Sequence, residues 1–260
     1  MDPWATLLAK AEAERTLAAE GPTLAAVIVE PLVQGAAGMW THPPDYLRAL
    51  HALAHRHGCL FIADEVATGF GRTGRMFACE HAGITPDVMC IAKGITGGYL
   101  PLAATLATEA VFEAFLAPYE DFKAFFHGHT YTGNALACAV ARASLQVFEE
   151  ERTLERLGPK IATLEARLAA EIEPLAHVGD VRQRGAMVGI ELVADRATRQ
   201  AYPPALRMGH RVIQAARRRG VILRPLGNVL VLMPPLAIAE DELALLLDVT
   251  RESIAEVTGS

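Results

Sequence analysis

CLFIADE, residues 59–65, is a run of five apolar residues that ends in two carboxylates. Runs of the same kind lie on either side of it, Leu24–Val29 towards the N-terminus and Val88–Ala92 towards the C-terminus. None of the three alternates between apolar and polar residues, and strands that are buried on both faces have this pattern. Because helical patterns separate the runs, residues 21 to about 150 are typical of βαβ units around a mainly parallel sheet.

The segment between the first two runs predicts a helix. Pro44 stands where this helix begins, since its fixed backbone angle suits a first turn, and Gly58 follows the last turn. The apolar residues of the segment recur on one helical face, at Leu47, Leu50, Leu53 and Ala54. Further along the chain we expect a fourth strand at Leu102–Ala107 and a long helix at Asn134–Glu149.

The composition changes near residue 150, where a charged amphipathic segment begins. We expect its helix to break or bend at Gly158 and Pro159, because proline lacks the amide hydrogen that a helix interior needs. Beyond it the pattern predicts a smaller α+β unit. The expected elements are strands at Val188–Val193, Val221–Arg224 and Asn228–Met233, a helix from about Ala205 to Arg219, and a terminal helix from Glu240. We therefore expect a large domain over residues 1–150 and a small C-terminal domain over residues 151–260.

Composition excludes several classes of protein. With 52% apolar and 21% charged residues, the 260-residue chain is not of the disordered class. A net charge of −6 and the absence of a basic stripe argue against a nucleic-acid partner, and no apolar run reaches the length of about 18 residues that a membrane span needs. The four cysteines form no CxxC pair, which favours buried thiols in a reducing compartment. We expect a cytoplasmic protein.

A carboxylate and an amine follow two of the strand-like runs. Asp64 ends the run at Cys59–Ala63, and Lys93 follows Val88–Ala92 after the length of one strand and one crossover. The carboxyl ends of neighbouring parallel strands meet at one edge of a sheet, where ligands bind. This pair suits a pyridine cofactor, whose ring nitrogen an aspartate keeps protonated and whose aldehyde a lysine binds as a Schiff base.

Other interpretations of the two residues are open at this point. Asp64 is also compatible with a helix-capping or loop acid, and Lys93 with a surface lysine in a turn. A third interpretation makes Lys93 a phosphate contact, with backbone amides supplied by Gly94, Gly97 and Gly98. The residue order is not that of the GxxxxGK[ST] loop, so the sequence gives the nucleotide interpretation little support.

Four ordered motifs resemble the class III aminotransferases, which are pyridoxal-phosphate enzymes of fold type I. They are VIVEPLVQGAAGM (27–39), IADEVATGFGRTG (62–74), CIAKGITGG (90–98) and HGHTYTGN (127–134). The resemblance implies an α/β fold, with the C-terminal part of a mostly parallel large domain followed by a small α+β domain. Three segments, MFACEHAG (76–83), HGHTYTGN (127–134) and LRPLGNVLVLMPP (223–235), are most similar to those members of the family that act in biotin biosynthesis. Those members convert 8-amino-7-oxononanoate to 7,8-diaminononanoate with S-adenosylmethionine as amino donor.

The resemblance also implies cofactor-binding residues. Lys93 matches the Schiff-base lysine, which is the catalytic base, and Asp64 matches the aspartate that pairs with the pyridine nitrogen. Thr130 matches a threonine that reaches the cofactor phosphate of the neighbouring subunit, which implies a homodimer with shared active sites. His129 and Gln34 match further cofactor-binding positions. Thr130 is equally compatible with a cap of the helix at Asn134–Glu149.

Substrate contacts are implied in the same way. Arg224 matches the arginine that binds the carboxylate of the keto-acid, although a surface arginine at a strand end is the simpler interpretation without the resemblance. Arg72 and Gly128 match other substrate-binding positions, and Glu30 matches a position that lines the cofactor pocket. The family uses no metal. The remaining histidines, His51, His55 and His57 among them, fit a solvated helix face.

The resemblance extends from about residue 20 almost to the end and covers roughly the C-terminal three fifths of a family member. We expect the first strands of the sheet, a Gly-Ser phosphate loop and an aromatic wall of the pocket to be absent. An exposed apolar sheet edge and weak affinity for the cofactor are the expected consequences. Two alternatives are another class III aminotransferase, acting on an ω-amino acid or a polyamine, and a non-catalytic fragment that only co-assembles.

Overall fold

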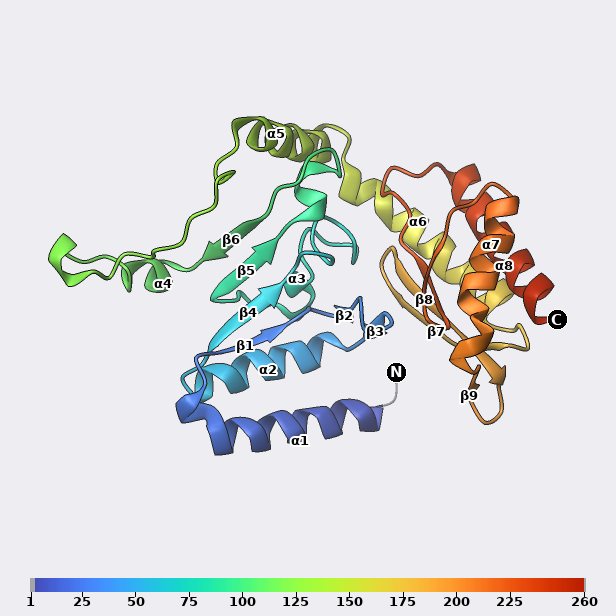
Figure 1. Cartoon of the computed structure of the whole chain (residues 1–260), viewed down its shortest axis with the longest axis horizontal. Helices are drawn as coiled ribbons and strands as arrows, with labels where there is room; N and C mark the ends of the chain where they lie inside the picture. The colour runs from blue at the N-terminus through green and yellow to red at the C-terminus, as the bar shows by residue number, and fades with distance from the viewer. Residues whose placement is uncertain (1–2, 260) are drawn as a thin grey trace. The chain divides into compact units, whose positions relative to one another are not determined.

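The computed structural model describes residues 3–259, which fold into two compact units (Figure 1). The first unit contains Met1–Leu32, His42–Phe70 and Arg75–Arg152, and the second contains Val33–Thr41, Gly71–Gly74 and Thr153–Ser260. Two short segments of the N-terminal half thus belong to the C-terminal unit.

A four-stranded sheet forms the centre of the first unit, in the order β1-β4-β5-β6. β1 (Ala26–Val29), β4 (Leu60–Asp64) and β5 (Val88–Ile91) are parallel, whereas β6 (Ala104–Ala107) runs antiparallel to β5. Phe61 and Ala63, which share one face of β4, are completely buried, whereas Leu60 of β4 and Ile28 of β1 are exposed. The burial on both faces that the continuous apolar runs predict is therefore wrong for these strands in this chain. The expected mainly parallel sheet is present, and β6 is its antiparallel edge.

Helices precede and follow these strands. They are α1 (Pro3–Glu20), η1 (Gly21–Thr23), α2 (Pro44–Arg56), α3 (Cys79–Ala82), η2 (Lys93–Thr96), α4 (Glu109–Glu113), η3 (Tyr119–Asp121) and α5 (Ala135–Glu150). α1 lies alongside α2 (Figure 1), and η2 packs against α5. Gly58 has a φ of +73° directly after α2, a conformation that glycine adopts without a steric cost.

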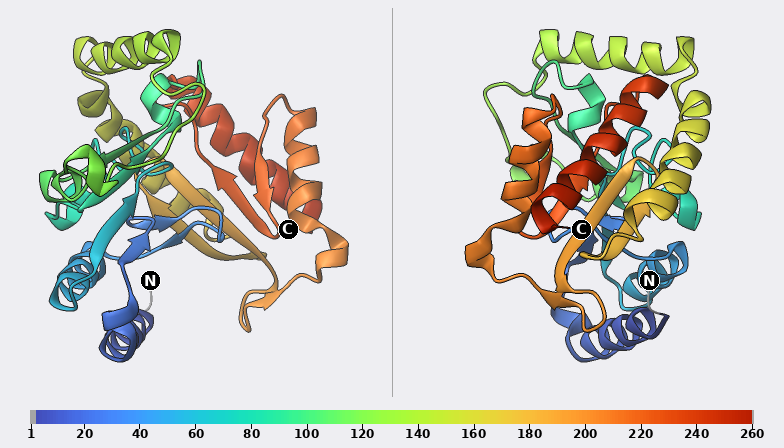
Figure 2. Two further views of the ribbon diagram at one scale, coloured as in Figure 1. Left: turned by 60° about the vertical axis from the view of Figure 1, so that its left-hand side comes forward. Right: turned by 90° about the vertical axis from the view of Figure 1, so that its right-hand side faces the viewer.

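Residues 112–136, which we call the arm, leave the sheet after β6 and return to α5 (Figures 1 and 2). Every residue of the arm is exposed. Its side chains include many large apolar ones, namely Phe112, Phe115, Leu116, Tyr119, Phe122, Phe125, Phe126 and Tyr131. A soluble monomer rarely exposes so many apolar side chains in one segment, so the arm is suited to contact with another molecule.

The second unit is an α+β structure. Its antiparallel sheet has the order β10-β11-β8-β7, with β9 paired to β8, and a separate pair is formed by β2 and β3. The strands are β2 (Val33–Gln34), β3 (Trp40–Thr41), β7 (Val178–Arg184), β8 (Met187–Asp195), β9 (Gln200–Ala201), β10 (Arg224–Leu226) and β11 (Val229–Leu232). The helices are α6 (Thr153–Arg167), η4 (Leu168–Ile172), η5 (Pro204–Leu206), α7 (Met208–Arg218) and α8 (Glu240–Thr258).

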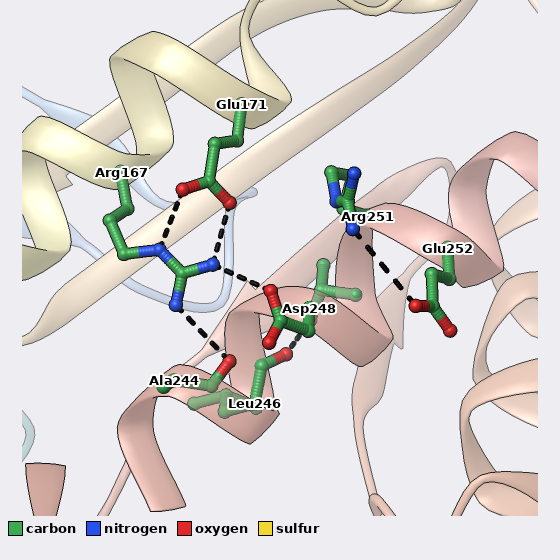
Figure 3. A network of polar contacts seen from close by, with 8 residues as sticks. Arg167, Glu171, Ala244, Leu246, Asp248, Arg251 and Glu252 are labelled. Carbon is green, nitrogen blue, oxygen red and sulfur yellow. Dashed lines mark hydrogen bonds and ion pairs between the residues drawn. The ribbon is translucent and has the colours of Figure 1, made fainter. Parts of the chain in front are cut away.

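An apolar core joins the sheet of the second unit to its helices. Fully buried side chains come from η4, β8, β11 and α8, and include Ile172, Ile190, Leu192, Leu230 and Leu247. An ionic network adds a polar connection between α6 and α8 (Figure 3). Arg167 donates from Nε and Nη2 to the carboxylate of Glu171, at 2.7 and 2.6 Å, and from Nη2 to Asp248 Oδ1 at 2.6 Å. These hydrogen bonds raise the pKa of Arg167 and lower that of Glu171.

The expected helix break at Gly158 and Pro159 is wrong. α6 continues through Pro159, and the interruption lies instead between α5 and α6 at Arg152, whose φ is +52°. A residue in this left-handed conformation ends a right-handed helix. Pro159 is exposed, so its ring lies on the solvent-facing side of α6.

Within residues 3–259, no helix combines the length and the apolar composition that crossing a membrane requires.

Candidate active site

Asp64 and Lys93 lie at the same edge of the first unit's sheet. Asp64 is the last residue of β4 and pairs in register with Cys90 of the parallel neighbour β5. Lys93 begins η2 just beyond the end of β5. The backbone N–H of Glu65 donates to the carbonyl of Cys90 at 2.9 Å, which connects the two strand ends directly. The register thus places the carboxylate of Asp64 and the amine of Lys93 at the same edge of the sheet.

The Asp64 side chain is half-buried. Its Oδ1 accepts a hydrogen bond from the backbone N–H of Val66 at 3.0 Å, which is the one hydrogen bond of this carboxylate within the described part of the chain. The bond fixes the carboxylate relative to the backbone and leaves acceptor capacity on Oδ2. The available oxygen is compatible with a ligand N–H at the carboxyl end of the sheet.

Lys93 has an exposed side chain on an unusual backbone. Its φ is +47°, a left-handed conformation that is uncommon for a residue other than glycine. The residue before it, Ala92, is extended, and Gly97 ends η2 with a φ of +59°. Strained backbone of this kind is concentrated at active sites and persists only where the surroundings hold it.

Glu65 is a buried carboxylate that the sequence analysis did not select. It is completely buried and accepts hydrogen bonds from Thr68 Oγ1 at 2.5 Å, Ala78 N at 3.0 Å and Cys79 N at 2.8 Å. The last two bonds satisfy backbone amides at the start of α3. Successive strand residues point to opposite faces, so an acid next to Asp64 at the end of a buried run was a usable signal.

The predicted residues Gly128, His129 and Thr130 lie in the arm and are exposed. His129 Nδ1 accepts from the N–H of Tyr131 at 3.2 Å. Among residues 3–259, no hydrogen bond joins these three residues to Asp64 or Lys93. The alternative role of Thr130 as a helix cap is wrong, because Asn134 caps α5 with a side-chain oxygen that accepts from Ala137 N at 3.0 Å.

The other predicted site residues are in the second unit, apart from Glu30. Gln34 in β2 and Arg224 at the start of β10 are exposed. Arg72 is half-buried, donates from Nη1 to the carbonyl of Pro234 at 2.6 Å, and has a pKa that burial lowers. Glu30 directly follows β1 in the first unit and is half-buried.

Two of the histidines do more than form a solvated face, which corrects that expectation. His55 Nε2 lies 2.7 Å from Asp87 Oδ2, and His51 Nε2 lies 3.2 Å from the carbonyl of Thr85. Burial and the neighbouring His55 lower the pKa of His51. These contacts connect α2 to the start of β5. No group of three or more His, Cys, Asp or Glu side chains in the described part of the chain is arranged to hold a metal ion.

The class III aminotransferase family model matches residues 4–254. The chain belongs to the class III aminotransferase family. The resemblance of the four motifs is thereby confirmed. The adenosylmethionine-8-amino-7-oxononanoate aminotransferase of Nitratidesulfovibrio vulgaris is 62% identical over 95% of this chain and 45% of its own length. The enzyme of the same name from Geobacter sulfurreducens is 54% identical over 95% of this chain and 54% of its own length.

Solved structures agree with the fold. The adenosylmethionine-8-amino-7-oxononanoate aminotransferase of Methanocaldococcus jannaschii matches with a TM-score of 0.92 and 43% identity, over 95% of this chain and 57% of that one. An amine transaminase from an uncultivated Pseudomonas species, in its PLP-bound form, matches with a TM-score of 0.91 and 38% identity. The match covers 99% of this chain and 60% of that one. The expected fold, α/β of fold type I, is confirmed. The chain spans about half the length of the curated relatives it matches.

Proposed function

We propose that this chain provides the catalytic lysine of a pyridoxal-phosphate-dependent transamination. The observation that carries the proposal is the common edge of Asp64 and Lys93, at the ends of two adjacent parallel strands. The names of the relatives support 8-amino-7-oxononanoate as amino acceptor, S-adenosylmethionine as donor and biotin biosynthesis as the pathway. The four free cysteines support a cytoplasmic location.

The residues of the strand ends fit this cofactor. Pyridoxal phosphate, when bound, supplies an aldehyde and a pyridine ring that acts as an electron sink. Asp64 has a free acceptor oxygen with which to hold a proton on the ring nitrogen. The exposed Lys93 is the residue that would hold the aldehyde of the bound cofactor, and its amine would be the base that accepts and returns a proton at this edge of the sheet.

The remaining predicted residues have binding roles in this proposal. Arg224 offers a planar guanidinium to the substrate carboxylate, and Arg72 and Gly128 complete the substrate contacts. Thr130, His129 and Gln34 bind the cofactor, and Thr130 does so from the partner subunit of a homodimer. The exposed apolar side chains of the arm support association with a second copy of the chain.

Chemical trapping tests the proposal. The purified chain is titrated with pyridoxal phosphate, its visible absorption is recorded, and the adduct is reduced with borohydride and mapped by mass spectrometry. The chain has four lysines, Lys10, Lys93, Lys123 and Lys160. We expect a new absorption band and modification concentrated at Lys93. Scattered modification over all four lysines, or no band, would contradict the proposal and favour a chain that only co-assembles.

A second candidate function is transamination of an ω-amino acid or a polyamine. It is favoured by the match to an ω-transaminase from Thermomicrobium roseum, with a TM-score of 0.91 and 37% identity. This activity uses the same lysine and aspartate, so trapping does not separate the two functions. Comparison of amino donors does, because transfer from S-adenosylmethionine supports the first and transfer only from simple amines supports the second.

A further inference from the structure

We propose that Phe70 is a positioning residue that holds the strained backbone of Lys93. The inference rests on the proposed function, which makes Lys93 the residue that binds the cofactor aldehyde. Both residues belong to the first unit. Phe70 lies against Gly94, next to Lys93, and is not a group that would touch the cofactor.

Phe70 is pressed against the residue that follows Lys93. A Cβ atom placed on Gly94 would lie 2.7 Å from Phe70 Cβ, 2.9 Å from Cδ2 and 3.0 Å from Cγ. Carbon atoms in van der Waals contact lie about 3.5–4.0 Å apart, so no side chain fits at position 94 beside this ring. Phe70 therefore limits how far the backbone at Lys93 and Gly94 can move towards it.

Two strained residues meet at this contact. Lys93 has a φ of +47° and Phe70 a φ of +56°, and both lie in the left-handed region that favours glycine. Each would relax to a negative φ if its surroundings allowed it. Because the two segments pack directly on each other, relaxation of either one requires the other to move.

Buried neighbours also pack against Phe70. Its side chain is 3% exposed and packs in a cluster with Ile91, Ile95 and Ala141. The ring of Phe77 lies edge-on to it, with centroids 5.6 Å apart. The N–H of the preceding residue, Gly69, donates to the carbonyl of Glu65 at 2.9 Å. Phe70 is therefore enclosed between Gly94 and these buried neighbours.

The same cluster includes the helical turn that Lys93 begins. Ile95 of η2 is buried in it, and Ile91 is the last residue of β5. Phe70 thus contacts the chain immediately after the lysine and packs with residues on both sides of it. Loss of the ring would let the backbone at Lys93 relax and displace Nζ from the edge that it shares with Asp64.

Site-specific trapping of the four lysines tests the inference. Phe70→Ala and Phe70→Leu are compared with the parent chain and with Phe148→Ala, a variant of the same residue type that packs against the same cluster from α5. Each protein is treated with limiting pyridoxal phosphate and borohydride, and the adduct at Lys93 is divided by the adduct at Lys10 and Lys123 of the same sample. The ratio compares sites within one molecule, so it is independent of protein and reagent concentration, and Phe148→Ala controls for a general loss of stability.

We expect the Lys93 ratio to fall about tenfold in Phe70→Ala and less in Phe70→Leu, because displacement of a reacting group by about 1 Å is costly. Phe148→Ala should leave it close to the parent value. Circular dichroism identifies variants that fold, and if Phe70→Ala does not, Phe70→Leu decides.

An unchanged ratio in folded Phe70 variants overturns the inference while leaving the proposed function intact. An equal fall in Phe148→Ala overturns it too, since the effect would then belong to the cluster as a whole. If the parent chain forms no adduct at Lys93, the proposed function is contradicted, and the inference, which rests on it, fails as well.

Discussion

The edge at the ends of β4 and β5 and the arm of residues 112–136 carry different parts of the proposed cofactor site, and they are constructed in opposite ways. At the edge, strand register gives Asp64 and Lys93 their common position. The buried Glu65 follows Asp64 in the chain, and the buried Phe70 lies against Gly94, the residue after Lys93. In the arm every residue is exposed, Thr130 included. The chain's own sheet therefore positions the first part of the proposed site, whereas no residue of the arm is buried against the rest of the described chain.

The most severe test of the edge is Lys93→Arg. The guanidinium keeps the positive charge but does not form a Schiff base, so we expect the mapped adduct at position 93 and the absorption band to disappear. Lys123→Arg is the matched control, because Lys123 is an exposed lysine of the arm. A band that persists in Lys93→Arg would show that another amine binds the cofactor.

Asp64→Asn tests the charge at the same edge. Asparagine retains an oxygen that can accept from Val66 N but cannot stabilise a protonated ring nitrogen. We expect affinity for pyridoxal phosphate, measured by absorption titration, to fall about 30-fold, as when one partner of a charged pair is lost. Asp64→Glu keeps the charge and serves as the control. Equal affinities of the parent and Asp64→Asn for pyridoxal phosphate would contradict the proposed pairing of Asp64 with the pyridine nitrogen.

Complementation tests whether the arm acts on a second copy. Thr130→Val should weaken cofactor binding about tenfold through the lost hydroxyl. When it is mixed and reassembled with Lys93→Arg, one of the two sites in the mixed dimer regains an intact lysine and an intact threonine. We expect the Lys93 adduct of the Thr130→Val chain to recover in the mixture. No recovery in a verified mixed dimer would place Thr130 in its own chain's site.

The apolar surface of the arm can be tested without changing Thr130. Phe126 and Tyr119 are 81% and 87% exposed. Replacing both by Asp should raise the dissociation constant of the dimer about tenfold in sedimentation experiments while leaving the thermal midpoint of a dilute sample unchanged. Leu245→Asp, on the exposed side of α8, is the control. An unaltered dimer would show that the arm is not part of the interface.

The smallest expected effect lies away from both regions, in the network around Arg167. Arg167→Ala should lower the free energy of unfolding by about 1 kcal/mol, since the carboxylates it pairs with are partly exposed. Arg167 holds the pKa of Glu171 below its ordinary value of 4.5. The paired carboxylate therefore stabilises the fold above that pH and ceases to do so as the pH falls below it. Urea unfolding at pH 7 and pH 3 should show the difference between parent and variant only at pH 7.

Much of the first unit could be predicted from its sequence because its information is local. Uninterrupted apolar runs identify β1, β4 and β5, and a polar residue after such a run marks the carboxyl end of a strand. The edge with Asp64 and Lys93 follows from these two signals. Phe70 did not stand out, because its role depends on a contact with Gly94 and on a backbone angle, neither of which has a sequence signature.

The second unit was harder to predict. β7 was missed because Asp180, Arg182 and Arg184 interrupt its apolar pattern, and the expected strand at Val221–Arg224 lies instead at β10, further along the chain. The membership of residues 33–41 and 71–74 in this unit is a long-range property. No local pattern encodes it, because it depends on contacts with residues far along the chain.

The arm also bears on how this sequence can change over time. It begins in α4 and ends in the first turn of α5, and none of its residues is buried. Lengthening such a loop costs only about 0.6 kcal/mol for each doubling, so the stability of its own chain places little restriction on its length or composition. The fold of this chain therefore restricts the phenylalanines and tyrosines of the arm little, and in the proposed homodimer selection on them would act through contact with the second copy.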